Sequence, residues 1–433
     1  MSEIDLRYGE SSVRLNMSGA KSVEILTGMD VPPISDFPRA FRLAVEDECI
    51  DSQPLRQLLS PGDKVTLIIS DITRFWMRQD KICPLLVEYL HTEARIPYEN
   101  IVILIALGGH RPQTEQEMKT LVTPEVFQKV RVLNHDCEAD DLVHVGRTPR
   151  GNDVFANPLA AGGRKVIVLS GTSYHLMSGY SGGRKSILPG ISGLETIRRN
   201  HIHSLSPDTP KTNPLIGLGV LEKNPVHEDM SEAARLVAPV FGVNIAVNSH
   251  GDICRIIAGD FEAAWEESCR ECERCMGVPI REKADIVVVS CGGFPKDINL
   301  YQGCKSLINV TQAARDGGEI VFFARCQEGG GTPAFFNWIE PLRKGELDAA
   351  LRAESTIDGY IFYAFCEALA RFDVHLLTDI PPGELAGMSI RVYSDAGSLL
   401  RNVDFTDKKV YVMPFGGNTV PFLQKNIPGR NEV

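Results

Sequence analysis

Short apolar runs alternate with amphipathic stretches along most of this chain. Three runs in the first half have the length and the β-branched content of buried strands, namely 65–71 (VTLIISD), 101–107 (IVILIAL) and 165–171 (KVIVLSG). The stretch 83–94 between the first two has helical periodicity. Strands that alternate with helices in this way predict an α/β architecture.

The second half of the chain repeats this alternation. A strand-like run begins near Ala284 (ADIVVVSCGGF), an amphipathic stretch covers 299–315, and a further apolar run follows at 319–326 (EIVFFARC). This order is typical of a strand, a helix and a second strand parallel to the first. A glycine loop, EGGGTP, comes directly afterwards.

The charged helical pattern of 261–281 separates the two halves. We therefore predict two α/β domains, an N-terminal cofactor-binding and catalytic domain at 1–265 and a C-terminal domain at 266–433, joined by a helical connector. The active site is expected in the cleft between them. The strand-like segment after about 405 could rejoin either domain, including the N-terminal one.

Polar or glycine residues follow each of the three strands in the first half. Asp71 to Arg74 follow the first strand, Gly108 to His110 the second, and Thr172 to His175 the third. In open α/β sheets, ligands bind beyond the carboxyl ends of the strands. We expect these three strand ends to converge on one site.

The composition limits which kinds of molecule the protein could bind. With 433 residues, 43% of them hydrophobic, the chain is long enough for two or three domains. A formal net charge of −11 speaks against a nucleic-acid surface, and the basic residues near Arg184 and Arg198 suggest a small anion instead. No apolar run approaches the roughly 20 residues of a membrane helix, and the start MSEIDLRYGE lacks a signal-peptide pattern. We therefore predict a cytoplasmic protein without a membrane partner.

Eleven cysteines, an odd number, fit reduced thiols better than a disulfide framework. Cys269, Cys272 and Cys275 recur every three residues, which is the beginning of an iron–sulfur pattern. The fourth ligand is absent, because Pro279 stands where the next cysteine is expected. A charged helix with incidental thiols is the favoured interpretation of this segment.

The segment 170–204 holds the most chemistry in the chain, including a lysine in a glycine turn. A phosphate loop needs glycine directly before its lysine, whereas Arg184 precedes Lys185. A neighbouring positive charge lowers the pKa of an amine and raises its nucleophilic fraction. Lys185 is therefore a candidate for covalent attachment, and the alternative is an ordinary solvated surface lysine.

Four histidines have positions that suggest function. His110 and His175 each stand just past a predicted strand, where sites form. His201 could bind a transition metal as a neutral imidazole. His201 and His203 could instead share the metal of a hydrolase, although no third ligand is evident nearby.

Five separated motifs resemble those of the nickel-pincer lactate racemases and related 2-hydroxy-acid racemases and epimerases. They are SDITR at Ser70, LGGHR at Leu107, SGYSGGRKSILPGISG, NHIHS, and LYQGCK at Leu300. The resemblance implies an isomerase that inverts C2 of a 2-hydroxy acid. It also implies hydride transfer to and from the cofactor through a planar 2-keto acid, which avoids a carbanion next to the carboxylate.

The resemblance further implies a role for individual residues. The catalytic residues would be His110 and His175, and the nickel ligand would be His201. The cofactor would be held by Lys185, Asp71 and His201, and the substrate by Arg74, Tyr301, Gln302 and Lys305. His203 would then give structural support, and Arg184 departs from the small residue that family members often carry at its position.

The implied cofactor is a nickel-pincer nucleotide, the nickel complex of pyridinium-3-thioamide-5-thiocarboxylic acid mononucleotide, attached covalently to Lys185. The implied partners are a small-molecule 2-hydroxy acid and the accessory enzymes that make the cofactor, and a homodimer is an open option. A rival interpretation is a non-catalytic protein that binds a 2-hydroxy acid or a nucleotide. Binding alone would not need two proton-transferring histidines together with a tethering lysine.

Overall fold

The computed structural model describes residues 3–331, 333–354 and 356–424. These residues form two compact units, which we name for their place in the sequence. The central unit comprises residues 30–207 and 213–275. The terminal unit comprises the chain up to residue 29, residues 208–212 and the chain from residue 276 onward.

The central unit contains a six-stranded sheet with the order β13-β12-β9-β4-β5-β6. All neighbouring strands are parallel except β13, which runs antiparallel to β12. The strands are β4 (Val65–Ser70), β5 (Ile101–Ala106), β6 (Arg131–Asn134), β9 (Lys165–Gly171), β12 (Phe241–Val247) and β13 (Ile253–Gly259).

The three strands predicted for the first half are confirmed as β4, β5 and β9. They are neighbours in the order β9-β4-β5 and run parallel, so their carboxyl ends lie at one edge of the sheet. The first five residues of β4 and of β5 are buried, which explains why both strands are continuous apolar runs rather than alternating ones. The predicted site residues Asp71, His110 and His175 come shortly after the ends of these three strands.

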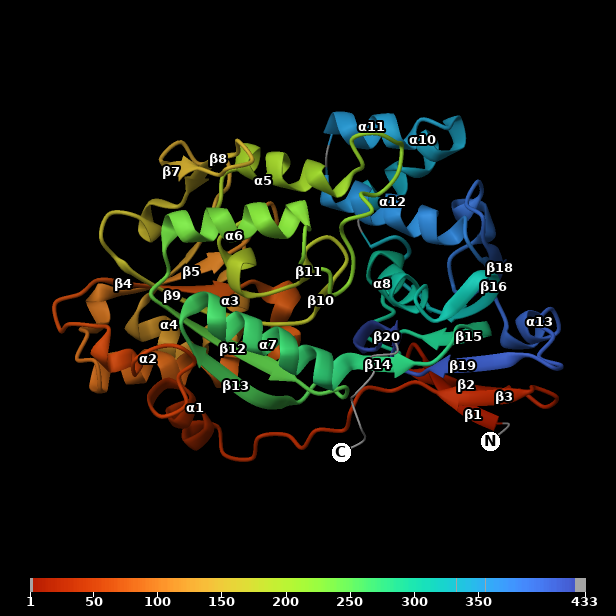
Figure 1. Cartoon of the computed structure of the whole chain (residues 1–433), viewed down its shortest axis with the longest axis horizontal. Coiled ribbons are helices and arrows are strands. Elements are labelled where there is room, and N and C mark those ends of the chain that lie inside the picture. The colour runs from red at the N-terminus through yellow and green to blue at the C-terminus, as the bar shows by residue number, and fades with distance from the viewer. Residues whose placement is uncertain (1–2, 332, 355, 425–433) are drawn as a thin grey trace. The chain divides into compact units, whose positions relative to one another are not determined.

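Side chains from the loop that carries Lys185 form part of the core of this sheet. Ile187 and Ile191 pack in one buried cluster with Ile68 of β4 and Leu104 of β5. Ala234 of helix α6 (Pro225–Val237) joins the same cluster. Figure 1 shows α6, with α5 (Leu194–His201) above it, over the strands of this sheet. The loop is therefore anchored to the sheet on its apolar side.

The terminal unit has its own six-stranded sheet, with the order β18-β17-β16-β15-β19-β3 and all neighbours parallel. Its strands are β3 (Ser22–Ile25), β15 (Ala284–Ser290), β16 (Ala314–Phe323), β17 (Asp373–Leu377), β18 (Arg391–Tyr393) and β19 (Lys409–Met413). Helix α8 (Leu300–Val310) contacts both β15 and α12 (Ile357–Leu369). Figure 1 shows α12 above α8, with β15 and β19 below α8.

Segments from the N-terminal and C-terminal parts of the described chain pair in the sheet of the terminal unit. Strand β3 pairs with β19, and the buried side chains of the hairpin formed by β1 (Glu3–Tyr8) and β2 (Ser11–Asn16) pack on the same core. The observed units differ from the predicted ranges 1–265 and 266–433 in three places. Residues up to 29 and residues 208–212 belong to the terminal unit, and the central unit extends to residue 275. The observed units also place β19, which lies after residue 405, with the C-terminal strands.

The connector expected at 261–281 contains helix α7 (Phe261–Met276) followed by β14 (Gly277–Ile280). Strand β14 pairs with β20 (Val420–Leu423) in the terminal unit. All eleven cysteines are free thiols. Among the described residues, Cys269 and Cys272 belong to no group of three or more side chains that could hold a metal ion. The three spaced cysteines lie within helix α7, as the charged helical pattern of the segment predicted.

Within the described ranges, no helix has both the length and the apolar character that crossing a membrane requires.

Candidate active site

Asp71 and His110 form a pair at the carboxyl ends of β4 and β5. Asp71 directly follows β4 and is 2% exposed, and its Oδ2 lies 2.5 Å from Nδ1 of His110. Its Oδ1 accepts a hydrogen bond from Thr73 at 2.6 Å. Burial raises the pKa of Asp71, but the hydrogen bonds from His110 and Thr73 and the charge of Arg74 outweigh it and hold that pKa below its usual range.

An ionised Asp71 fixes where the proton of His110 lies. The carboxylate can only accept, so Nδ1 of His110 carries the proton and Nε2 is left with its lone pair. The side chain of His110 is 34% exposed, so a ligand can reach it. This histidine is therefore arranged to accept a proton at Nε2 while Asp71 stabilises the resulting cation.

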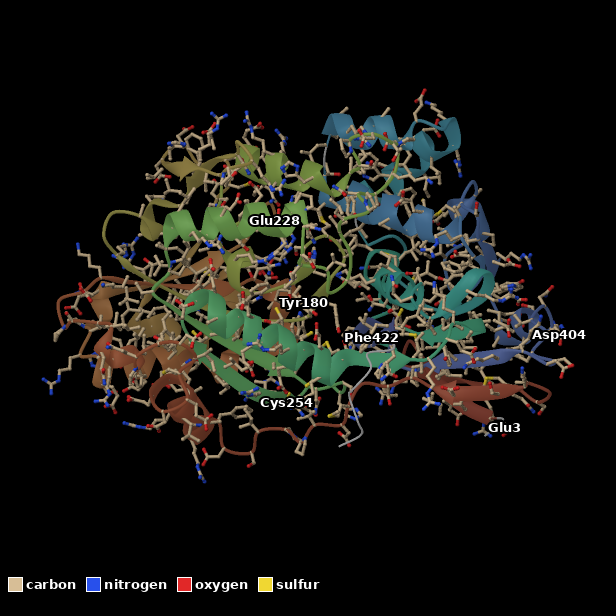
Figure 2. All side chains as sticks on the ribbon, in the orientation of Figure 1. Glu3, Tyr180, Glu228, Cys254, Asp404 and Phe422 are labelled. Carbon is tan, nitrogen blue, oxygen red and sulfur yellow. The ribbon has the colours of Figure 1, made fainter. Side chains whose placement is uncertain are left out.

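His175 belongs to a tight hairpin that follows β9. The hairpin pairs β10 (Tyr174–His175) with β11 (Gly179–Tyr180), and Tyr180, labelled in Figure 2, ends it. Nδ1 of His175 accepts from the backbone N–H groups of Met177 at 3.2 Å and Ser178 at 3.3 Å. Because Nδ1 uses its lone pair in these contacts, the proton of the neutral ring lies on Nε2.

Nε2 of His175 meets the side chain of Lys185. Lys185 lies in the short helical turn Gly183–Ser186, and its Nζ is 3.0 Å from Nε2. An ammonium group could not donate to an Nε2 that already carries a proton, so the lone pair of a neutral amine must accept this hydrogen bond. The loss of water around the amine, together with the charges of Arg74 and Arg184, lowers the pKa of Lys185 well below its usual range.

His175 experiences the same environment. Desolvation lowers its pKa well below the usual value, and the positive charge of Arg74 acts in the same direction. The geometry and the electrostatics therefore agree that the imidazole and the amine are both neutral.

His201 is the last residue of α5 and is buried. Desolvation lowers its pKa to about 3, so it stays in the neutral form that binds metals. His203 has other charged neighbours, namely Asp229 and Arg150. Burial lowers the pKa of His203, Asp229 raises it and Arg150 lowers it further. The two imidazoles therefore do not share one set of surroundings.

Arg74 links the two histidine pairs. It follows β4 in the helical turn Ile72–Met77, and its Nη1 donates to Thr73 at 3.1 Å. Its positive charge acts on Asp71, on His175 and on Lys185. The structure thus gathers six predicted site residues in the central unit, namely Asp71, Arg74, His110, His175, Lys185 and His201.

Arg184 supports this group in a way that the sequence did not reveal. It is 2% exposed, and its Nη2 and Nη1 donate to the carbonyls of Ser178 at 2.6 Å and Tyr180 at 3.2 Å. Its Nε donates to Nδ1 of His227 at 2.8 Å, and its guanidinium lies 3.8 Å from the ring centroid of Trp265. Arg184 is therefore a buried clamp on the hairpin of His175.

The clamp could not be recognised from local spacing. Its partners His227 and Trp265 come from α6 and α7, far along the chain from position 184. The only signal in the sequence was that an arginine stands at position 184, where family members often carry a small residue.

The three remaining predicted residues lie together in the terminal unit, on the first turns of α8. Asn299 caps this helix by accepting from the N–H of Gln302 at 3.0 Å. Nζ of Lys305 donates to Oε1 of Gln302 at 2.7 Å and lies 5.2 Å from the ring centroid of Tyr301. These side chains form one compact polar group.

Comparison with known proteins places this arrangement in a family. The family model described as the lactate racemase N-terminal domain matches residues 8–212, and the lactate racemase C-terminal domain matches residues 280–419. The chain belongs to the lactate racemase family. A lactate racemase of Thermoanaerobacterium thermosaccharolyticum is 29% identical over 433 residues, covering 97% of this chain and 99% of that protein. One of Lactiplantibacillus plantarum is 30% identical over 345 residues, covering 78% and 79% of the two chains.

Solved structures give the same result. The lactate racemase apoprotein of Thermoanaerobacterium thermosaccharolyticum matches with a TM-score of 0.84 at 27% identity, covering 97% of this chain and 99% of that one. A protein of Thermotoga maritima shares the fold alone, with a TM-score of 0.64 at 18% identity over 92% of this chain and all of that one. The expectations of an α/β fold and of a racemase, an isomerase, are thereby confirmed. Lactate racemases are known for a nickel cofactor.

Proposed function

We propose that this protein interconverts the two configurations at C2 of a 2-hydroxy acid, with lactate as the first substrate to test. The observation that carries the proposal is the contact between Nε2 of His175 and a neutral Lys185 amine, beside the buried imidazole of His201. Desolvating an amine without a carboxylate partner costs stability, and a nucleophilic role for Lys185 would give a functional reason for that cost. Family membership supports the reaction class.

The donor groups fit the nickel-pincer nucleotide implied by the sequence. A neutral amine at Lys185 is the form that attaches to an electrophile, and a neutral imidazole at His201 is the form that binds nickel. Asp71 would contribute a fixed negative charge to the cofactor site. When bound, the cofactor would take up hydride from C2 of the substrate and return it.

The two other histidines would handle the hydroxyl proton. Nε2 of His110 is free to accept it, and the ionised Asp71 stabilises the imidazolium that results. Attachment of Lys185 uses the amine lone pair that accepts from Nε2–H of His175, so this N–H would be free to donate to the substrate oxygen. For His175 to take up the hydroxyl proton at Nε2, its own ring proton would first have to move to Nδ1. Two groups are needed because the oxygen of each enantiomer points in a different direction.

Cationic and polar side chains would bind the rest of the substrate. Arg74 carries a charge beside both histidine pairs and can hold a carboxylate bidentately. We assign Tyr301, Gln302 and Lys305 to the substrate as well, because they form a single polar group with one cation.

The test is a label-retention experiment on protein loaded with cofactor by the accessory enzymes. L-lactate deuterated at C2 is incubated in ordinary water, and the D-lactate formed is separated by chiral chromatography. Hydride transfer predicts that the deuterium stays at C2 in the product. Loss of the label to solvent would show carbanion chemistry and overturn the hydride mechanism.

A companion measurement addresses the tether. Intact-mass analysis of loaded protein should show one cofactor adduct, which Lys185→Ala loses and the exposed Lys223→Ala keeps. An adduct of equal yield in Lys185→Ala would place the attachment elsewhere. The cytoplasmic location, the accessory enzymes, the homodimer and the site between domains stay predictions.

A further inference from the structure

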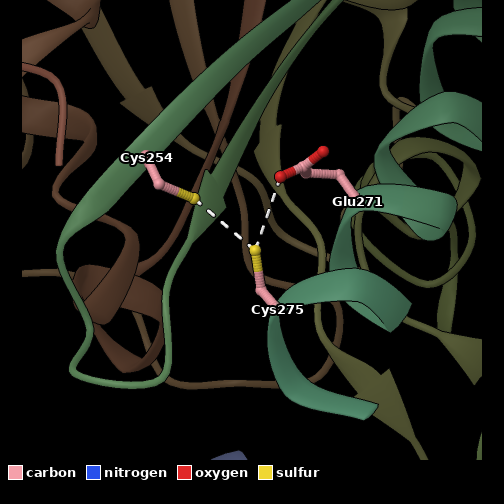
Figure 3. A group of neighbouring side chains, drawn as sticks. All are labelled: Cys254, Glu271 and Cys275. Atoms are coloured by element: carbon pink, nitrogen blue, oxygen red, sulfur yellow. Dashed lines mark hydrogen bonds between the residues drawn. The ribbon is translucent and has the colours of Figure 1, made fainter. Parts of the chain in front are cut away.

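Two cysteines and a glutamate form a tight cluster that the racemase chemistry does not use. Cys254 comes from β13, and Glu271 and Cys275 come from α7. Figure 3 shows the sulfur of Cys275 between the sulfur of Cys254 and the carboxylate of Glu271. Glu271 is 4% exposed, Cys275 is fully buried and Cys254 is half-buried, so solvent reaches one side of the cluster.

Two of the three distances within the cluster match those around a tetrahedral zinc ion. Two thiolates that bind one zinc at ~2.3 Å lie about 3.8 Å apart, and a sulfur and a carboxylate oxygen about 3.5 Å apart. Sγ of Cys254 and Sγ of Cys275 are 3.7 Å apart, and Sγ of Cys275 is 3.4 Å from Oε1 of Glu271. All three ligand atoms lie within 4.8 Å of one another, and within the described ranges no other group of this kind occurs.

We propose that Cys254, Glu271 and Cys275 bind a zinc ion, with water as the fourth ligand. Two sulfurs and one oxygen form a donor set that suits zinc and excludes magnesium or calcium, which prefer oxygen alone. None of the three residues is assigned to the racemase reaction, so the zinc site is separate from it and does not depend on it.

Zinc binding replaces two protons. The thiol of Cys275 donates to Glu271, and the thiol of Cys254 donates to the carbonyl of Ala246 at 3.5 Å. Both protons leave to the solvent when the sulfurs bind the metal as thiolates. No oxidant or reductant takes part.

Two arginines hold the carboxylate of Glu271. Nη1 of Arg255 lies 3.1 Å from Oε2, and Nε of Arg274 donates to the same oxygen at 3.2 Å. Nη2 of Arg274 also donates to Oε1, which has a second lone pair for the metal once the Cys275 thiol has lost its proton. The ligands carry three negative charges once both thiols ionise, one more than the two arginines offset, so a dication is attracted. Outer partners of this kind fix the geometry of a metal ligand.

The position of the cluster suggests what zinc would do. Cys254 lies on β13, the edge strand of the central sheet, and Cys275 lies in the last turn of α7. The chain leaves the central unit at Cys275 and enters the terminal unit at Met276. A bound zinc would tie the end of α7 to the sheet at this crossing point.

Cobalt titration of the loaded enzyme under reducing conditions tests the proposal. Co²⁺ alone should bind at one equivalent with thiolate-to-cobalt absorption, and Zn²⁺ should then displace it. Cys254→Ser and Cys275→Ser should lose the absorption, and Glu271→Gln should weaken Zn²⁺ binding at least about tenfold, as loss of even an outer partner does. Cys269→Ser is the matched control, because Cys269 is buried on the same helix outside the cluster.

Two results would overturn the zinc site. One is cobalt absorption of equal strength in wild type and in Cys275→Ser. The other is a native protein that is two mass units lighter than expected and carries Cys254 and Cys275 in one disulfide-linked peptide pair, because a disulfide leaves no thiolates to bind metal. Racemase activity in the same samples reports separately on the proposed reaction.

Discussion

At the scale of single residues, the site depends on which nitrogen atoms carry protons. The Asp71 carboxylate places one proton on Nδ1 of His110, and two backbone N–H groups place another on Nε2 of His175. Because Nε2 of His175 carries a proton, the Lys185 amine that contacts it must accept the hydrogen bond and is therefore neutral. Neutral bases held away from water have a thermodynamic consequence, because the unfolded chain can protonate them and the folded chain cannot.

His201 should make the protein sensitive to acid before the cofactor is attached. Its folded pKa of about 3 lies below its unfolded value of about 6.5, so the unfolded state binds more protons between these limits. The free energy of unfolding should therefore fall as pH decreases from about 6.5 toward 3, and His201→Gln should have a shallower acid limb. Urea unfolding at a series of pH values measures this, and parallel curves for the two proteins would contradict it.

Arg184 should matter for stability and for the reactivity of Lys185. Arg184→Met keeps an unbranched apolar stem but leaves the carbonyls of Ser178 and Tyr180 without their donor, so we expect a loss of about 2–5 kcal/mol in the free energy of unfolding.

Arg199→Met is the control for this change. Arg199 is exposed and forms an ion pair with Glu195 one helical turn away, so its removal should cost less than about 1 kcal/mol. Equal losses in the two variants, measured by urea unfolding, would refute the clamp. Slower cofactor attachment in Arg184→Met than in Arg199→Met would show that the clamp also positions Lys185.

At the scale of elements, what could be predicted depended on burial. Strands β4, β5 and β9 are apolar along their length because both faces are covered, so periodicity was sufficient to find them. Strand β3 has four residues, none of them fully buried, and becomes a strand only by pairing with β19. Its place in the sheet is a long-range property that no local pattern records.

In the candidate site, too, some features could be predicted from local sequence and others depend on long-range contacts. Polar residues directly after strands could be predicted, because strand order and direction bring their ends to one edge. The hairpin of His175 has two-residue strands and no periodic pattern to recognise. Its geometry depends on the glycine turn at Gly182 and on Arg184, whose partners His227 and Trp265 are distant in the sequence.

Gly182 should be irreplaceable in this turn. Its φ is +72°, and a Cβ there would lie 2.9 Å from the carbonyl oxygen of Gly171 on β9. Gly182→Ala should therefore lower the free energy of unfolding by about 1–3 kcal/mol and reduce cofactor attachment at Lys185.

Gly162→Ala separates the two causes of this effect. Gly162 has a similar φ of +70°, but a Cβ added there would have no neighbour within 4 Å, so only the backbone cost of about 1 kcal/mol applies. Thermal unfolding and intact-mass analysis measure both variants. A smaller loss in Gly182→Ala than in Gly162→Ala would show that the approach to Gly171 is not tight.

At the scale of the whole molecule, the proposed functions divide between the two units. The central unit holds the residues proposed for cofactor attachment and proton transfer, and the terminal unit holds Tyr301, Gln302 and Lys305. The terminal unit also includes both ends of the chain through the pairing of β3 with β19. Changes in α8 should therefore leave cofactor attachment intact.

Lys305→Ala tests this division directly. Loaded protein should keep the full mass increment at Lys185, whereas kcat/KM for lactate racemisation should fall at least about 100-fold, the equivalent of about 2.7 kcal/mol, because a charged hydrogen bond to the substrate is lost. Lys344→Ala changes an exposed lysine of the same unit and should alter neither quantity. A missing mass increment in Lys305→Ala would show that the terminal unit takes part in attachment. An unchanged kcat/KM would remove Lys305 from the substrate site while leaving the tether at Lys185 untouched.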